Sequence, residues 1–201
     1  MKNIFIKTLL FIAILCGYFA LAPWAQVAKR NAALIQQIDS MFASDQFWRI
    51  EYTKKERREI SIYSYEGIRK NWSEVDRINQ LKAKLIIKKY GYPGYDLVGS
   101  SSDSFWIIIQ HCDNDIPFQE RVLALMKQQI AKNNASKEKY AYLTDRILVN
   151  KDQKQIYGTQ LSRDNKTGKY SPFPLKDPKS VDKLRKEVGL EPIAIYINNF
   201  E

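Results

Sequence analysis

His111 is the only histidine in the chain, and it stands at the end of an apolar run that begins at Phe105. Asp113 and Asp115 follow it within one turn. A histidine titrates near neutral pH, and a carboxylate can orient its ring and stabilise the protonated form. This group is therefore suited to general acid or base catalysis. The residue types alone favour the structural alternative, a buried histidine whose ring nitrogens are satisfied by backbone or carboxylate groups.

Two further groups of polar residues are placed where chemistry could occur. Asp145 and Arg146 lie beside the main apolar stripe of a predicted helix, on a side that need not face solvent. Tyr157 projects from a predicted strand, and the neighbouring Gly158 would allow a close approach to the backbone or form a bulge. Both groups could belong to a polar pocket or to a buried structural network.

Several common chemistries have no signature in the sequence. There is no His-Glu-x-x-His pair and no cysteine cluster, so a standard zinc site is not expected. The chain also has no glycine-rich phosphate loop and no Gly-x-Ser-x-Gly elbow. The sequence therefore predicts no metal site and no cofactor.

A helix over residues 31–49 would position the first acidic side chain. Leu34, Ile38 and Phe42 belong to an apolar stripe at helical spacing, and extending the stripe leads to Asp45 and then Arg49. Residues four apart face each other on a helix. We therefore expect Asp45 and Arg49 to form a structural pair on the inward side.

The remaining elements predict a compact, mainly α-helical domain with a small β-hairpin, an α+β fold. We expect a helix from Ser73 to Gly91 and a buried element around 105–111, either helix or strand, capped by Ser102 or Asp103. Further helices are predicted from N-caps at Asp115, Ser136 and Asp177. Residues 51–70 are interpreted as a charged connecting segment, and residues 155–172 as the hairpin.

The N-terminus is typical of a targeting segment. Lys2 and Lys7 precede an uncharged stretch of residues 8–28, which is 21 residues long. Residues 1–28 could be a signal peptide, cut after Ala22 or Ala25, or a retained anchor long enough to cross a bilayer. Residues 29–201 then form one domain outside the cytoplasm, at the cell envelope. Within that domain Cys112 is the only cysteine, so we expect it to be buried and unpaired.

The chain carries a formal net charge of +10, with basic clusters at residues 54–58 and 82–89. An exported basic protein meets anionic lipid or wall polymers more often than nucleic acid, which is an unlikely partner here. A solvated surface that keeps the protein soluble is the favoured interpretation. The membrane is an expected partner through the N-terminal segment, and the oligomeric state is left open.

The ordered motifs resemble a bacterial family catalogued only as a domain of unknown function, over about residues 34–196. The connecting segment 51–70 is long for that family, and Tyr92 stands where the family usually has tryptophan. The resemblance implies that the polar positions above form the family signature, which makes a functional and a structural role for His111 equally favoured. The motifs are, in chain order, Asp45-Gln46-x-x-Arg49, Gly91-Tyr92-Pro93, Val98-Gly99, Gln110-His111-x-Asp113-x-Asp115, Phe118-Gln119, Tyr142-Leu143-Thr144-Asp145-Arg146, Tyr157-Gly158-Thr159-Gln160 and Val181-Asp182-x-x-Arg185 with Val188-Gly189-Leu190.

Three hypotheses follow, and they leave open whether the protein is an enzyme. In the first it is a hydrolase in which His111 is the general base or acid, oriented by Asp113 or Asp145, with Tyr157 in the same pocket. In the second the pocket binds an envelope ligand without chemistry. In the third, pairs such as Asp45–Arg49 only lock helices together. The expected substrate-binding residues are Gln110, Gln119, Arg146, Tyr157 and Gln160, with Arg146 holding an anionic group.

Overall fold

The computed structural model describes residues 30–200 and confirms a mainly helical fold with one small antiparallel hairpin. The predicted targeting segment lies outside the described residues. Among residues 30–200, no helix is both long enough and apolar enough to cross a membrane. The elements are α1 (Ala32–Glu56), α2 (Tyr65–Tyr90), α3 (Tyr95–Val98), α4 (Ser101–Gln110), α5 (Ile116–Ile130), α6 (Lys137–Asn150), β1 (Leu161–Arg163), β2 (Tyr170–Pro172), α7 (Val181–Glu187) and α8 (Ile193–Asn198).

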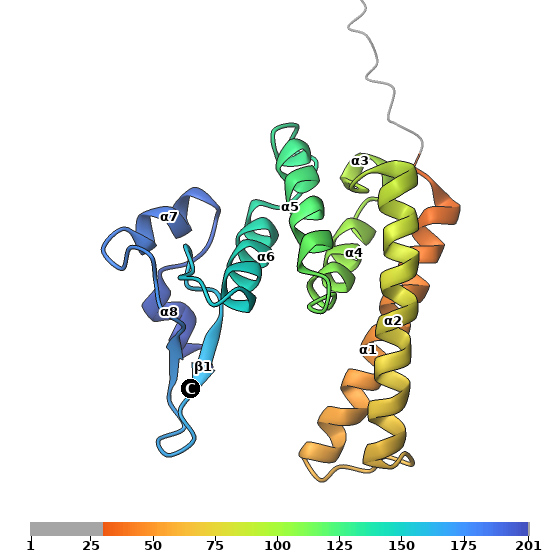
Figure 1. Ribbon diagram of the computed structural model, residues 1–201, viewed down its shortest axis with the longest axis horizontal. Coiled ribbons are helices and arrows are strands. Elements are labelled where there is room, and N and C mark those ends of the chain that lie inside the picture. The colour runs from red at the N-terminus through yellow and green to blue at the C-terminus, as the bar shows by residue number, and fades with distance from the viewer. Residues whose placement is uncertain (1–29, 201) are drawn as a thin grey trace, which may run out of the picture.

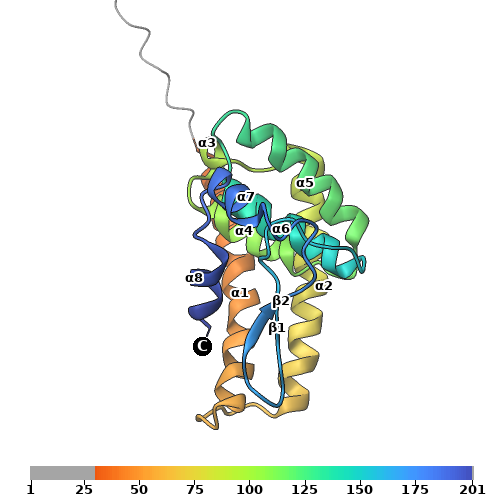
Figure 2. The ribbon, with the colours of Figure 1, turned by 90° about the vertical axis from the view of Figure 1, so that its left-hand side faces the viewer.

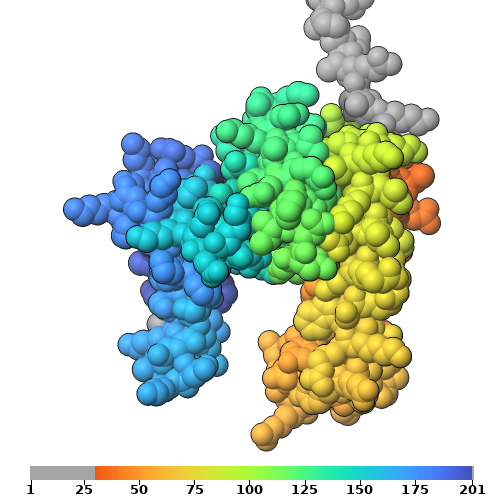
Figure 3. Space-filling view, viewed as in Figure 1, coloured from red at the N-terminus to blue at the C-terminus, as the bar shows by residue number. Residues whose placement is uncertain are grey.

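The elements form two projecting ends joined by a bridge. Figure 1 shows α1 and α2 side by side as a long helical hairpin, with α7, α8 and the strands at the opposite end and α3–α6 between them. Turned by 90°, the strands extend from the bridge in the same direction as the α1–α2 hairpin (Figure 2). The space-filling view shows a hollow between the two ends, below the bridge (Figure 3).

The hydrophobic core is centred on α4. Phe105, Ile108 and Ile109 of this helix are at most 1% exposed, and they belong to the same buried cluster as Ile38 and Met41 of α1. Full burial of each such side chain stabilises the fold by about 1.5–3 kcal/mol. The wholly apolar run around 105–111 is therefore a buried helix and not a strand.

Helix starts agree with the predicted caps at two of four positions. The cap predicted at Ser102 or Asp103 is wrong, because α4 already begins at Ser101 and both residues lie inside it. The side chains of Asp115 and Ser136 cap α5 and α6, and each accepts a hydrogen bond of 3.1 Å from a backbone N–H of the first turn. Asp177 does not cap α7, which begins four residues later at Val181. Its carboxylate instead accepts backbone N–H groups within a turn that precedes the helix.

The connection between the first two helices is shorter than residues 51–70, which is a correction to the predicted boundary. Helix α1 continues to Glu56 and α2 begins at Tyr65, so the connection covers residues 57–64 only. Aromatic packing sustains both helices beyond the aliphatic stripe. The rings of Tyr52 and Trp72, for example, meet edge to face with centroids 5.5 Å apart.

Candidate functional site

His111 forms a pair with a buried carboxylate from a distant part of the chain. Its Nδ1 lies 2.9 Å from Oδ1 of Asp45, whose side chain is 1% exposed. The prediction that Asp113 or Asp145 orients the imidazole ring is therefore wrong. The inward stripe of α1 continues past its last apolar residue to Asp45, and α1 packs along α4, so the carboxylate reaches the residue that ends α4.

The predicted Asp45–Arg49 pair forms and is extended to α2. Nη1 of Arg49 lies 2.8 Å from Oδ1 of Asp45, and the guanidinium also donates two hydrogen bonds, of 3.1 and 3.2 Å, to the carboxylate of Asp76. It stacks 4.7 Å from the ring centre of Trp72. The side-chain amide of Gln46 donates a hydrogen bond of 2.7 Å to the other carboxylate oxygen of Asp45. Together these contacts fix the carboxylate against the imidazole.

The histidine ring lines a pocket of about 600 Å³ between α2 and the connection from α4 to α5. His111 is 17% exposed, and its Nε2 makes no hydrogen bond to any residue of the described chain. With Nδ1 held by Asp45, Nε2 is the ring atom available to a bound molecule. The pocket is lined by Arg69, Trp72, Ser73, Asp76, Arg77, Gln80, His111, Asp113 and Asn114.

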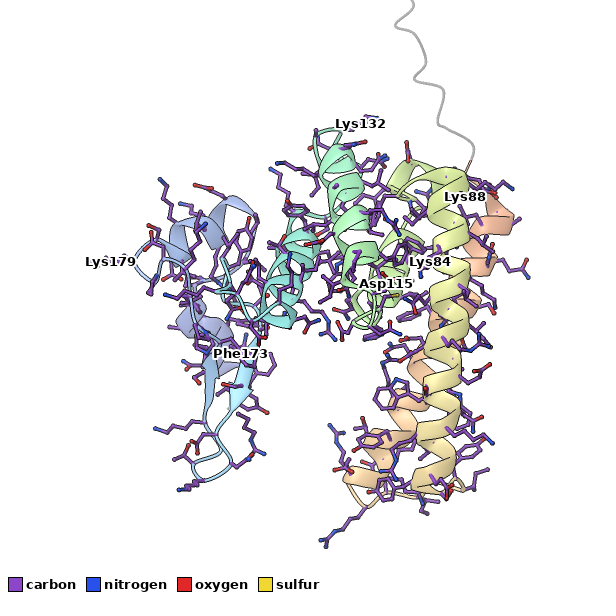
Figure 4. The ribbon with its side chains drawn as sticks, viewed as in Figure 1. Lys84, Lys88, Asp115, Lys132, Phe173 and Lys179 are labelled. Carbon is purple, nitrogen blue, oxygen red and sulfur yellow. The ribbon has the colours of Figure 1, made fainter. Side chains whose placement is uncertain are left out.

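Further contacts hold the α4–α5 connection against α2. The ammonium of Lys84 lies 2.6 Å from the carboxylate of Asp115, and both residues are labelled in Figure 4. The side-chain amide of Gln80 donates a hydrogen bond of 3.2 Å to the same carboxylate. The hydrogen bond from Lys84 outweighs the opposing effect of burial and lowers the pKa of Asp115. These contacts fix one wall of the pocket relative to the other.

Asp113 also lines the pocket, but its carboxylate is occupied. Arg146 donates from Nε at 2.8 Å and also from Nη2, and Asn150 donates at 2.9 Å. Burial on its own would raise the Asp113 pKa, yet the hydrogen bonds and charge of Arg146 outweigh burial and the pKa is lowered. Asp113 is therefore an ionised anchor for Arg146 and does not orient His111.

The pocket lining contains two arginines, Arg69 and Arg77. Arg77 is neutralised by Glu74, with two hydrogen bonds of 2.7 and 2.9 Å. Within residues 30–200, Arg69 makes no ion pair, and its side chain lies at the exposed end of the pocket wall formed by α2. The pocket therefore presents a free positive charge in addition to the His111 ring.

Asp145 does not line this pocket, which corrects its predicted catalytic role. It is fully buried, and its two oxygens accept hydrogen bonds of 2.7–3.1 Å from the backbone N–H groups of Ile156, Tyr157 and Thr159 and from the Thr159 hydroxyl. Burial raises the pKa of Asp145, and these hydrogen bonds oppose that effect. The carboxylate thus shapes residues 155–160 into a loop around itself, which explains why β1 begins only at Leu161.

Tyr157 and Gln160 belong to the same loop and lie outside the lining of the pocket. The carbonyl of Tyr157 accepts a hydrogen bond of 2.8 Å from the buried Arg185. Gln160 donates from its side chain to the Thr159 hydroxyl at 3.1 Å and exchanges backbone hydrogen bonds with the side chain of Gln155. Through these contacts the two residues hold the loop between α6 and the C-terminal elements in place.

Gln119 is structural in its observed contacts, and Gln110, of which only the backbone carbonyl takes part in them, also lies outside the pocket lining. Gln119 is fully buried and donates to the carbonyls of Ile109 and Gln110 at 3.1 and 3.3 Å, so it caps the C-terminal end of α4. Its amide also approaches Asp113 at 3.4 Å. Gln119 thereby supports the turn that carries His111, without lining the pocket.

The pocket wall on α2 was missed by sequence reasoning, although a signal was present. Trp72, Asp76 and Gln80 recur every four residues, and so form a continuous row on a helix. Of this row only Trp72 lies outside the helix predicted from Ser73, because that prediction placed the helix start eight residues too late. Within residues 30–200, no group of three or more His, Cys, Asp or Glu side chains is placed to hold a metal ion. Cys112 is buried, and burial raises its thiol pKa to about 12.

The fold and site define a mainly helical protein with a histidine–aspartate pair at the edge of a polar pocket. The chain belongs to a family of unknown function, DUF6624, which matches residues 33–201. The comparison with curated proteins and the comparison with solved structures gave no match. Membership of the family agrees with the resemblance inferred from the ordered motifs, and it assigns no activity.

Proposed function

We propose that the protein is a hydrolase in which His111 is the general base or acid and Asp45 is the residue that orients it. One observation carries the proposal: a buried carboxylate holds Nδ1 at 2.9 Å while the same ring lines a pocket of about 600 Å³. In this arrangement Asp45 fixes the tautomer with hydrogen on Nδ1 and stabilises the imidazolium that forms during the reaction.

The proposed reaction uses Nε2 twice. In the first step Nε2 takes a proton from water while the oxygen of that water adds to the electrophilic centre of the substrate. In the second step the same nitrogen returns the proton to the leaving group as its bond to the centre breaks. Neither Asp76 nor Asp113 is proposed as the proton donor, because each is ion-paired with an arginine.

The lining suggests which substrate groups would bind. Arg69 is proposed to bind an anionic group, a role that the sequence had suggested for Arg146, which is occupied by Asp113. Trp72 offers an apolar ring surface, and Gln80 and Asn114 supply polar groups along the same wall. An anionic molecule with a hydrolysable bond and one apolar or ring-shaped face would complement this lining.

The experiment is a turnover screen of the purified full chain against chromogenic carboxylic esters, phosphodiesters and glycosides. His111→Gln and Asp45→Asn should each lower kcat for the accepted class by about 10²-fold or more, since general acid–base catalysis contributes about 10²–10⁴-fold. Asp152→Asn is the matched control, because Asp152 is exposed and lies outside this pocket. Unchanged turnover in His111→Gln would exclude the proposed mechanism.

A non-catalytic binding module is the second candidate, and the ion-paired lining favours it. Two carboxylates and one arginine of the pocket wall are already neutralised, so His111 is the one lining residue proposed to transfer protons. If no substrate class is turned over but an anionic ligand shifts the resonances of the single histidine, the pocket binds without chemistry.

We also propose that the protein acts at the cell envelope. The support is the sequence of residues 1–28, with two lysines before an uncharged stretch long enough to be a signal peptide or an anchor. Cell fractionation with N-terminal sequencing of the mature protein distinguishes release, anchoring and retention in the cytoplasm. An uncleaved protein in the soluble cytoplasmic fraction would contradict the location.

A further inference from the structure

The tip of the α1–α2 hairpin exposes apolar side chains where a water-soluble surface would not. Ile60 and Ile62 in the connection of residues 57–64 are 93% and 87% exposed. Phe47, Ile50 and Tyr65 on the adjoining turns of the two helices are each at least 40% exposed. Exposed apolar side chains grouped at one end of a helical hairpin are typical of an interaction site.

The connection is built so that the polar residue faces inward and the isoleucines face outward. Ser61, which stands between them, donates a hydrogen bond of 2.6 Å to the buried carboxylate of Glu51. Its carbonyl accepts a hydrogen bond of 3.1 Å from Lys55. This is the reverse of what the hydrophobic effect favours in water. Ile60 and Ile62 are thus presented by a fixed loop.

The segment that carries the exposed isoleucines is rich in basic and aromatic residues. Residues 51–70 contain six lysines and arginines against four glutamates, and one of those glutamates, Glu51, is buried. In the described chain only Lys54 of the six basic residues is ion-paired. Trp48 and Tyr63 pack edge to face just behind the loop, 5.0 Å apart. The six basic residues are Lys54, Lys55, Arg57, Arg58, Arg69 and Lys70.

We propose that this tip is a membrane-docking site that inserts Ile60 and Ile62 into the interface of a bilayer containing anionic lipid. Exposed apolar side chains with flanking cations fit such a surface, since apolar groups enter the headgroup boundary and Lys and Arg are attracted to anionic lipid. Tyrosine and tryptophan are enriched at the same depth. The proposal does not require the chemistry proposed for the pocket, with which it shares only Arg69.

The tip and the start of the described chain lie at opposite ends of α1, so docking at the tip would be a separate membrane contact from that of the N-terminal segment. Residue 30, where the described chain begins, lies at the opposite end of α1 (Figure 1). Helix α1 has 25 residues, so the two ends are about 37 Å apart at a rise of about 1.5 Å per residue. A test must therefore detect insertion at the tip itself and not only binding of the protein.

The experiment places an environment-sensitive fluorophore on the full chain in a Cys16→Ser background, at Ile62→Cys or at Ile195→Cys. Ile195 is the matched control, because it is 51% exposed on α8, away from the tip. Vesicles contain phosphatidylcholine, with or without phosphatidylglycerol, and carry nitroxide-labelled lipid as a quencher. We expect anionic vesicles to quench the probe at 62 by half or more and to leave the probe at 195 unchanged.

A second substitution tests the apolar contact. Ile60→Asp should abolish quenching at position 62, while Leu85→Asp, at a 65% exposed site on α2 outside the tip, should not. Equal quenching at positions 62 and 195, or none at 62, would overturn the proposal. Equal quenching by vesicles without phosphatidylglycerol would overturn the role of anionic lipid. A blue shift that grows with protein concentration in the absence of vesicles would identify a second copy as the occupant instead.

Discussion

Asp145→Asn should destabilise the protein strongly, because both carboxylate oxygens accept hydrogen bonds from donors that cannot reverse their role. Oδ1 accepts from the backbone N–H groups of Ile156 and Tyr157, and Oδ2 accepts from those of Tyr157 and Thr159. An asparagine NH₂ placed at either position faces at least one backbone N–H. A buried donor left unpaired costs about 1–3 kcal/mol, and the lost charge-assisted hydrogen bonds add to that cost.

An opposing effect reduces this cost. Removing the charge relieves the desolvation that raises the Asp145 pKa, but the relief does not supply an acceptor for the loop. We expect a net loss of about 2–4 kcal/mol. Since about 1 kcal/mol shifts Tm by about 2–4 °C in a domain of this size, the melting temperature should fall by about 5–15 °C.

Thermal unfolding followed by circular dichroism measures this loss. Asp152→Asn is the matched control, because Asp152 is exposed and adopts a positive φ that asparagine tolerates well. The control should change stability by less than about 0.5 kcal/mol. If Asp145→Asn melts within about 2 °C of the native protein, the structural role assigned to Asp145 is refuted.

Two further stability predictions follow from the structure. Gly94→Ala should lower stability by about 1–3 kcal/mol, because a Cβ there would lie 2.6 Å from the carbonyl oxygen of Asn134. Gly67→Ala, in the first turn of α2, is the control and should be neutral or stabilising. Equal melting temperatures of the two variants would contradict this prediction. The Asp113 pKa is lowered in the folded state, so its contribution is full above the ordinary value of about 3.9 and is lost as pH falls through the folded pKa. Arg146→Gln should therefore lower Tm most near neutral pH and least at acid pH below the folded pKa, and a Tm difference that stays constant from neutral to strongly acid pH would refute that origin.

The sequence predicted the parts of the fold that depend on local pattern. The caps at Asp115 and Ser136 are set by one side chain and the N–H groups of the next turn, so they were visible without tertiary information. The start of α2 was not visible, because its first two turns are held by aromatic contacts such as Tyr52 with Trp72 in place of an aliphatic stripe. Boundaries that depend on packing between helices cannot be read from periodicity.

The candidate site shows the same division. The Asp45–Arg49 pair follows from a spacing of four residues on one helix, and it forms. The partner of His111 is 66 residues away in sequence, so only the packing of α1 against α4 brings Asp45 to the ring. Asp145 carried the same chemical signal as Asp45, a carboxylate near the apolar face of a helix. Residue type and spacing could not distinguish a carboxylate that holds a loop from one that holds the histidine.

The tautomer of His111 tests the central claim most directly, and the protein offers an unusually clear measurement because it has one histidine. Nitrogen-15 NMR of the tag-free protein should show a neutral ring with its hydrogen on Nδ1, held by Asp45, and with Nε2 unprotonated. In Asp45→Asn the tautomer should shift toward hydrogen on Nε2, because the asparagine amide can donate to Nδ1. A native protein whose neutral ring carries its hydrogen on Nε2 would contradict the proposed role of His111 as a base in the pocket.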